Sequence, residues 1–363
     1  MSNYFSFKFK LIAAVFTFAA FTLVQAKDKP LKVFILVGQS NMQGTGHVKT
    51  LPYMAKDPVT KPLHDKIVDS KGKYLSYKDV QITAISDKDS EKNGALTIGY
   101  GSNLTKPEVC GPELAFGITM YEKLGEPILI IKTSWGGKSI AVDFRPPSAG
   151  APDIGKNDEQ KEKNRKAAGH YYRLMKDHVK KILADPGKFH PAYNKSAGYE
   201  IAGFAWFQGW NDMVNGGAYP NRYKPGGYDD YTKVLAHFIR DVRKDFNAPK
   251  MPFAIGVMGV GGPTKDYESP RYKGVHQYFR DAMAAPASMP EFKGTVKTVL
   301  TENFWPKDVE DAEKKKRAKK ELTEEEKVTL ETGKSNAGFH YLGNLKCYSQ
   351  IGEALAKVIC EMN

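Results

Sequence analysis

Short apolar runs rich in β-branched residues recur along this chain, and they constrain its fold more than any other feature. Six such runs lie at residues 31–37, 80–85, 127–132, 201–207, 252–258 and 295–300. Helical patterns occur at residues 171–183, 228–246 and 273–285, in a segment that begins at Pro112, and in a last segment at residues 344–361. Strands that alternate with helices pair in parallel through right-handed crossovers. The sequence therefore predicts an α/β fold, a three-layer α/β/α sandwich around a mostly parallel sheet.

The N-terminus is separate from this pattern. Lys8 and Lys10 precede an apolar stretch of 14 residues, 11–24, which small residues follow. Because roughly 20 residues are needed to span a bilayer, a secretory signal peptide over residues 1–26 is favoured over a membrane anchor. We therefore expect residues 27–363 to form one exported domain, periplasmic or secreted, with no stable membrane insertion once the signal peptide is removed.

The charge of the chain is basic. Removal of the two lysines of the signal peptide lowers the formal net charge from +13 to +11. A basic surface can attract nucleic acid or another polyanion. Much of the charge, however, is lysine in mixed-sign stretches such as residues 161–166 and 314–320, a pattern typical of solvated helix faces. We therefore expect no nucleic-acid partner.

The chain has three cysteines, Cys110, Cys347 and Cys360. One disulfide and one free thiol are compatible with an exported protein, and the pairing cannot be read from the sequence. Cys347 and Cys360 fall in the last predicted helix, thirteen residues and so roughly 20 Å apart, which is too far for a disulfide between them. No spacing suggests metal ligands, and we expect neither a metal nor a cofactor.

Small polar turns follow three of the apolar runs. They are Gly38-Gln39-Ser40-Asn41-Met42, Trp135-Gly136-Gly137 and Gly209-Trp210-Asn211-Asp212, and a histidine, His340, lies just ahead of the last helix. Ligands of open α/β sheets bind at the carboxyl ends of the strands, so we expect these turns to meet at one edge of the sheet. Ester hydrolysis needs a nucleophile, a base and donors for the oxyanion. Ser40 is the candidate nucleophile.

In this order the four segments resemble the Ser, Gly, Asn and His blocks of the SGNH hydrolases. The wording Gly38-Gln39-Ser40-Asn41-Met42 resembles the branch that contains sialate O-acetylesterases and related carbohydrate acetylesterases. The resemblance implies a flavodoxin-like sheet and an esterase that removes O-acetyl groups from sialate, xylan or another plant or algal polysaccharide. It also implies that Ser40 is the nucleophile, His340 the base, and Ser40, Gly136 and Asn211 the oxyanion hole.

Other side chains of these turns receive supporting roles. Gln39, Gln208 and Trp210 are expected to line the sugar-binding site, which would hold an acetylated carbohydrate. Asp212 is expected to fix its loop rather than to react.

The sequence departs from the family pattern ahead of the histidine. The usual block is Asp-x-x-His, and Ala337 stands at the Asp position. His340 then acts in a Ser-His dyad, takes an orienting group from elsewhere, or belongs to a degraded catalyst. We hypothesise that a backbone carbonyl or Glu302, which follows the last predicted strand, orients the imidazole.

Two other functions stay open. A GDSL-type lipase would need an apolar acyl groove, whereas the polar turn at Ser40 and the nearby Trp210 suit a small acyl group on a sugar. The replacement at Ala337 also allows a non-catalytic carbohydrate-binding protein on an esterase scaffold. The sequence gives no prediction of the oligomeric state.

Overall fold

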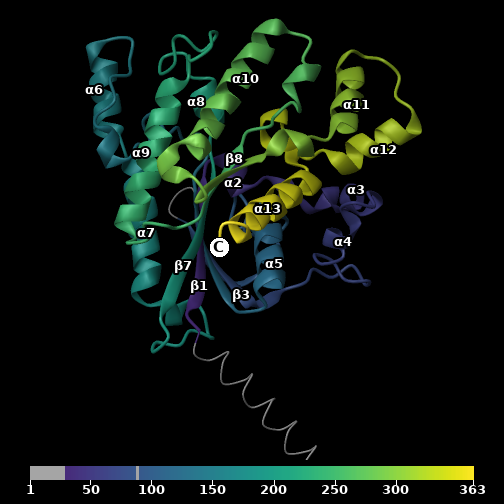
Figure 1. The fold of residues 1–363 in the computed structure, drawn as a ribbon. Coiled ribbons are helices and arrows are strands. Elements are labelled where there is room, and N and C mark those ends of the chain that lie inside the picture. Colours follow the sequence, from purple (N-terminus) through teal and green to yellow (C-terminus); the bar gives the residue numbers. More distant parts are fainter. Residues whose placement is uncertain (1–28, 87–89) are drawn as a thin grey trace, which may run out of the picture.

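The computed structural model describes residues 29–86 and 90–363, and its centre is a seven-stranded sheet (Figure 1). Six parallel strands lie in the spatial order β3 (Tyr77–Ile85), β6 (Ile128–Ser134), β1 (Leu31–Gly38), β7 (Tyr199–Phe207), β8 (Phe253–Val257) and β9 (Val296–Leu300). These are the six strands predicted from the apolar runs. The predicted signal peptide lies outside the described residues.

A seventh strand, β4 (Glu91–Leu96), was not predicted. It pairs antiparallel with β3 at the edge of the sheet. Its sequence, Glu-Lys-Asn-Gly-Ala-Leu, is polar and mostly solvent-accessible. An edge strand of this kind lacks the apolar run that marks a buried strand.

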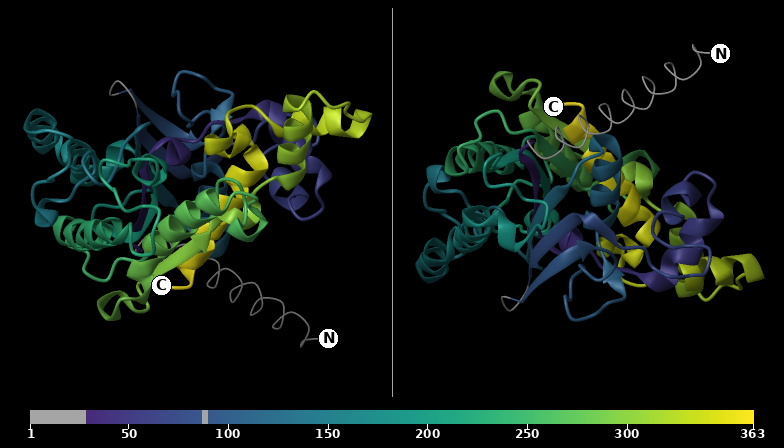
Figure 2. Two further views of the ribbon diagram at one scale, coloured as in Figure 1. Left: turned by 90° about the horizontal axis from the view of Figure 1, so that it is seen from above. Right: turned by 90° about the horizontal axis from the view of Figure 1, so that it is seen from below.

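Helices cover both faces of the sheet, which confirms the three-layer sandwich (Figures 1 and 2). The helices α5 (Glu113–Leu124) and α13 (Leu345–Cys360) cover one face, α7 (His170–Ala184) and α9 (Asp229–Asp245) cover the other, and α10 (Pro270–Ala284) packs beside α9. On the first face Phe34 of β1 meets Phe116 of α5, with ring centroids 5.7 Å apart. On the second face Trp206 of β7 meets Phe238 of α9 at 4.4 Å. Burial of such aromatic side chains is the main stabilising contribution of both layers.

The strand order places a ligand site at the carboxyl ends of β1 and β7. Apart from the β3–β4 pair, the order β6-β1-β7-β8-β9 is the 2-1-3-4-5 order of flavodoxin-like sheets, in which ligands bind where the order reverses. Gly38, the last residue of β1, is in register with Ser134 of β6 and with Phe207 of β7. The three turns predicted to be functional therefore begin side by side at the carboxyl ends of neighbouring strands.

The remaining elements lie outside the central sandwich. The segment 45–79 contains α3 (Leu51–Lys56) and α4 (Lys61–His64), and residues 139–157 lead into α6 (Asp158–Ala167). A small pair of strands, β2 (Gly46–His47) and β5 (Val109–Cys110), lies apart from the main sheet. The charged segment before His340, which includes the mixed-sign stretch at residues 314–320, forms two helices, α11 (Lys307–Arg317) and α12 (Glu324–Gly333). A capping box of Thr323 and Glu326 begins α12.

The three cysteines are free thiols. Cys347 and Cys360 lie on α13, as predicted, and Cys110 and Cys347 are buried. In the described part of the chain, every helix falls short of the length and apolar character needed to cross a membrane.

Candidate active site

Ser40 begins a short helix, α2 (Ser40–Gln43), directly after β1. The N–H groups of Met42 and Gln43 donate to the carbonyl of Gln39 at 2.8 Å, which closes the turn around the serine. Gly38 is needed here, since a Cβ atom at this position would lie 2.1 Å from the carbonyl oxygen of Phe207. The turn is therefore pressed against β7, and Ser40 is left half-buried at the sheet edge.

The side chain of Gln39 joins the β1 turn to the β7 turn. Its Oε1 accepts from the backbone N–H groups of Gly209 (3.1 Å) and Asn211 (3.3 Å), and its Nε2 donates to Asn211 Oδ1 (2.8 Å). Asn211 lies in the short helix α8 (Trp210–Met213). Because Gln39 holds the oxygen of the Asn211 amide, the Nδ2 group at the other end of that amide faces away from Gln39. This orientation suits an oxyanion donor.

Gln39 and Gln208 are 1% and 2% exposed. Gln208 Nε2 donates to Gln39 Oε1 (3.2 Å), to the carbonyl of Lys138 (3.0 Å) and to Asp212 Oδ2 (2.5 Å). We expected both glutamines to bind substrate. Their burial and mutual contact instead indicate a positioning role, because side chains that are almost completely buried do not face a ligand.

Asp212 ties the β7 turn to the loop that follows Gly136. Its two carboxylate oxygens accept from the N–H groups of Ile140 (2.9 Å) and Ala141 (3.0 Å), and Tyr219 donates to it at 2.9 Å. Burial raises the pKa of Asp212 to about 6, and these hydrogen bonds oppose that rise. The fully buried carboxylate thus fixes the loop, as predicted, and with it the place of the half-buried Gly136.

His340 is presented by a distorted 3₁₀ segment, η9 (Gly338–Gly343). The two residues that follow His340 within this segment, Tyr341 (φ 50°) and Leu342 (φ 58°), adopt the left-handed conformation. This conformation costs about 1–3 kcal/mol at each such residue. The buried Tyr341 hydroxyl accepts from the N–H of Gly259 (2.7 Å) and contacts the Thr301 hydroxyl (2.5 Å). These bonds anchor the strained segment to the ends of β8 and β9.

The amide of Asn336 contacts the imidazole of His340. Asn336 Oδ1 lies 3.1 Å from His340 Nδ1 and accepts from the N–H of Ala337 at 2.7 Å. An acceptor at Nδ1 places the ring proton there and leaves Nε2 available as the base. Burial lowers the pKa of His340, so the imidazole is neutral and able to accept a proton at neutral pH. Glu302, the acid that we singled out, forms an ion pair with Arg280.

The segments that carry Ser40 and His340 are hydrogen-bonded to each other. Asn41 Nδ2 donates to the carbonyl of Phe339 at 3.1 Å, and the buried Tyr348 hydroxyl lies 3.1 Å from both Asn41 Oδ1 and the carbonyl of His340. Within residues 29–86 and 90–363, no hydrogen bond joins the Ser40 hydroxyl to His340 itself. Catalytic hydrogen bonds are often long in ligand-free enzymes and tighten on binding.

Aromatic rings border the site. Trp210 stacks on Phe339, with centroids 5.7 Å and planes 30° apart, and the ring of Phe339 meets that of His340 at 4.4 Å. Phe339 is 42% exposed. Trp210 and Phe339 thus form an aromatic surface next to His340.

A buried ion pair is hydrogen-bonded to the turn that carries Ser40. Lys132 of β6, 1% exposed, donates to Glu113 (2.7 Å) and to the carbonyls of Gln43 (2.8 Å) and Tyr100 (2.7 Å). Glu113 also accepts from the N–H of Gly111 at 2.8 Å. Burial lowers the pKa of Lys132, and the attraction of Glu113 opposes the shift. We did not predict this pairing, although a lysine at the end of an apolar strand is the signal that could have revealed it.

A hollow of about 380 Å³ opens beside Asn211. Its polar lining includes Ser139, Asp143, Lys156, Gln160, Asn164 and Asn215. In the described ranges, no group of three or more His, Cys, Asp or Glu side chains is arranged to hold a metal ion.

Residues 30–293 match the family described as carbohydrate esterase, sialic acid-specific acetylesterase. The match includes Ser40, Gly136 and Asn211 and ends before the segment that carries His340. A comparison with curated protein sequences gave no significant match.

Several solved structures are similar to this chain at low sequence identity. One is a protein from Arabidopsis thaliana, with 19% identity over 84% of this chain and 95% of that one, and a TM-score of 0.43. Another is a novel carbohydrate acetylesterase from Xanthomonas citri, with 13% identity over 74% of this chain and 49% of that one, and a TM-score of 0.41. A third is a carbohydrate esterase family 2 enzyme plus carbohydrate binding domain from Corynascus thermopiles (Myceliophthora fergusii), with 13% identity over 92% and 67% and a TM-score of 0.38.

Proposed function

The chain belongs to the carbohydrate esterase family of sialic acid-specific acetylesterases, and from this premise we propose that it is a serine esterase that removes O-acetyl groups from carbohydrate. One observation carries the assignment of the site. Gln39, the neighbour of Ser40, holds the oxygen of the Asn211 amide at 2.8 Å. The candidate nucleophile and a candidate oxyanion donor are thereby fixed to each other at the edge of the sheet.

In the first half of the reaction, the Ser40 hydroxyl oxygen attacks the carbonyl carbon of the acetyl ester, and His340 Nε2 takes the hydroxyl proton. The electron pair of the carbonyl π bond moves to oxygen. The N–H groups of Ser40 and Gly136 and the Nδ2 group of Asn211 donate to this oxyanion. When the carbonyl reforms, the bond to the sugar oxygen breaks, the sugar takes the proton from His340, and acetyl-Ser40 remains.

In the second half, His340 takes a proton from water and the resulting hydroxide attacks acetyl-Ser40. The tetrahedral intermediate uses the same donors. Its collapse releases acetic acid, which ionises to acetate, and returns the proton to Ser40. Asn336 supports both halves as a positioning residue, since its contact with Nδ1 (3.1 Å) keeps the imidazole in one orientation.

The surroundings of the site favour a small acyl group on a polar substrate. The 380 Å³ hollow beside Asn211 is lined mainly by polar side chains, whereas a lipase needs an apolar acyl groove. The stacked pair of Trp210 and Phe339 offers an aromatic face of the kind that binds sugar rings. We also propose that the enzyme is periplasmic or secreted, because residues 1–26 have the sequence of a signal peptide.

The test is acetate release from acetylated xylan and from O-acetylated sialic acid, with the purified protein beside Ser40→Ala. Release that is lost in the variant supports the proposal, and the preferred substrate identifies the glycan class. No release from either substrate by the wild-type protein, together with glycan binding, would contradict it and favour a non-catalytic carbohydrate-binding protein.

A further inference from the structure

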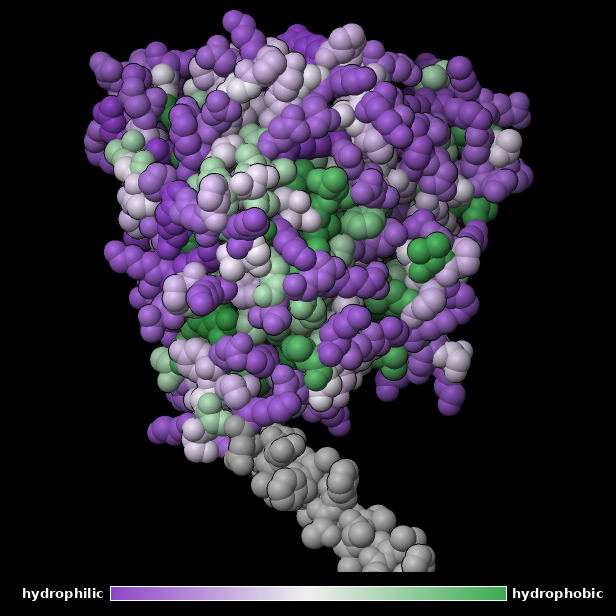
Figure 3. Space-filling model, in the orientation of Figure 1, coloured by the Kyte–Doolittle hydropathy of each residue, from purple (hydrophilic) through white to green (hydrophobic). Residues whose placement is uncertain are grey.

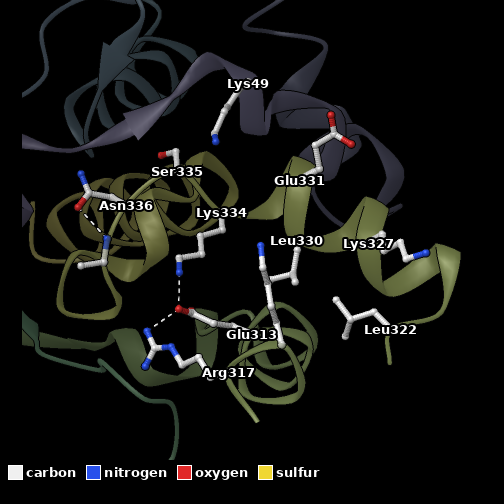
Figure 4. Close-up of a pocket in the computed structure, with 12 residues that line it drawn as sticks. Lys49, Glu313, Arg317, Leu322, Lys327, Leu330, Glu331, Lys334, Ser335 and Asn336 are labelled. Carbon is white, nitrogen blue, oxygen red and sulfur yellow. Dashed lines mark hydrogen bonds and ion pairs between the residues drawn. The ribbon is translucent and has the colours of Figure 1, made fainter. Parts of the chain in front are cut away.

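A second hollow, of about 980 Å³, lies among α11, α12 and the segment that leads to His340 (Figure 4). Its lining is strongly basic. It contains five cationic side chains, Lys49, Lys316, Arg317, Lys327 and Lys334, and two acidic ones. A concave surface lined by one sign of charge concentrates ligands of the opposite sign.

The two carboxylates do not neutralise the hollow. Glu313 pairs with both Arg317 and Lys334, so one anion serves two cations (Figure 4). Lys327 pairs with Glu324, which lies outside the lining. Lys49 and Lys316 are exposed and have no ion-pair partner among the described residues. The amino group of Lys49 points into the space between α12 and the segment at Ser335 (Figure 4). Positive charge is therefore available to an incoming anion.

The lining of the same hollow includes the residue that contacts the base of the proposed reaction. Asn336, whose Oδ1 lies 3.1 Å from His340 Nδ1, and Ala337 both contribute to its lining. Ala337 is the position where the family pattern has aspartate. A carboxylate there would add a negative charge to a hollow that otherwise favours anions. The neutral pair Asn336 and Ala337 orients His340 without this repulsion.

Apart from Lys49, the residues that line the hollow belong to a part of the chain that the family match does not include. The match ends at residue 293, whereas α11 and α12 span residues 307–333. The surface over these helices is mostly hydrophilic (Figure 3). The volume falls within the range of sites for ligands larger than a single ion. The hollow is thus formed mostly by residues that follow the part of the chain matched to the family.

We propose that this basic hollow binds a carboxylate- or sulfate-bearing sugar of the same glycan whose acetyl ester reacts at Ser40. The substrate class is then an acidic, O-acetylated polysaccharide rather than a neutral one. This inference rests on the proposed function, because it uses the closeness of the hollow to His340.

The first test reverses the two unpaired charges in a Lys49→Glu, Lys316→Glu double variant. The readout is the ratio of kcat/KM for acetylated polygalacturonate to that for acetylated xylan. We expect the ratio to fall about tenfold, because each exposed charge contributes modestly, and to fall in the wild-type protein as salt is raised. The control is the double variant Lys195→Glu, Lys250→Glu. It reverses the charge of two exposed lysines that precede β7 and β8, at the amino-terminal ends of the strands and therefore away from the proposed site. Its ratio should equal that of the wild type.

The second test separates this inference from the esterase activity. Binding of unacetylated oligogalacturonate and of dextran sulfate to Ser40→Ala is measured by calorimetry, with and without the two charge reversals. Binding of either probe that weakens at least tenfold in the reversed protein supports the inference, and the probe that binds identifies a carboxylate or a sulfate. Binding of neither probe, or binding that the reversals leave unchanged, would overturn it. Absence of acetate release from every ester would refute only the proposed function.

Discussion

Replacement of Asn336 by aspartate should supply His340 with the acid that its segment lacks. In the wild-type protein Asn336 Oδ1 lies 3.1 Å from His340 Nδ1 and 2.7 Å from the N–H of Ala337. Aspartate has the same shape and keeps both acceptor contacts. The substitution therefore adds one negative charge beside the imidazole and changes little else.

The expected size of the effect follows from this geometry. Two unit charges about 4 Å apart interact with about 4 kcal/mol at an effective dielectric constant near 20. His340 and Asn336 are only half-buried, so solvent screens much of this energy. Neighbouring opposite charges shift a pKa by about 1–3 units, and we expect about one unit here, or about 1.4 kcal/mol. The sign is upward, because the carboxylate favours the protonated imidazole.

The assay is kcat/KM for p-nitrophenyl acetate between pH 4.5 and 9, which reports the free enzyme. Activity requires neutral His340, so it is lost as the pH falls through the pKa that burial lowers in the wild type. In Asn336→Asp the midpoint should move up by about one pH unit, and the alkaline plateau should rise about threefold to tenfold, since the carboxylate stabilises the imidazolium formed in the transition state. Asn336→Ala should lower the plateau at least tenfold without an upward shift of the midpoint. An unchanged profile in both variants would refute a role of Asn336 in positioning the base.

Three further predictions concern neighbouring parts of the structure. Asn211→Ala should lower kcat for acetate esters by about 10²–10³, or about 2.7–4 kcal/mol. Asn211→Asp keeps an acceptor for Gln39, so it should lose as much activity with a smaller loss of stability. Wild-type activity in both variants would exclude a role of Asn211 in the oxyanion hole. Glu113→Gln should lower the free energy of unfolding in urea by about 3–5 kcal/mol, because Lys132 is left buried without its counter-ion. A decrease below about 1 kcal/mol would contradict the prediction that Lys132 stays charged and buried without Glu113. Burial raises the pKa of Asp212 from 3.8 to about 6, so protonation of this carboxyl stabilises the folded state below about pH 4, and that stabilisation is lost as the pH rises through about 6. In urea titrations at pH 4 to 7, the free energy of unfolding of Asp212→Asn should lack this decrease with pH. The same pH dependence of the free energy of unfolding in both proteins would contradict the pKa shift.

The strands, and the meeting of the three turns that form the candidate site, could be predicted because they depend on local chemistry. Runs such as Leu31–Gly38 are buried on both faces of a parallel sheet and therefore consist of consecutive apolar residues. Parallel pairing places the carboxyl ends of β1 and β7 on the same side of the sheet, and the observed register pairs Gly38 with Phe207, so the turns after the two strands meet. The polar strand β4 gave no such signal, since an exposed edge needs no apolar run.

The contacts around the base could not be predicted for a different reason. The contact between Asn336 and His340 depends on the left-handed backbone conformation of Tyr341 and Leu342. Their side chains disfavour this conformation, and it cannot be predicted from the sequence. Tertiary hydrogen bonds of the Tyr341 hydroxyl with Gly259 and Thr301 help to hold it in place, and the carbonyl of Leu342 accepts from the N–H groups of Ser335 and Asn336. Burial of polar residues such as Gln39 is likewise decided by partners that lie far away in the sequence.

The central claim is that Ser40 is the nucleophile of an acetylesterase. Its most direct test is to treat the protein with a fluorophosphonate, locate the adduct by mass spectrometry, and follow acetate release from the best substrate in the same samples. We predict one adduct per chain, on Ser40, with loss of activity in proportion to labelling and no labelling of Ser40→Ala. An adduct on another serine, or full acetate release by protein that is fully labelled at Ser40, would contradict the claim.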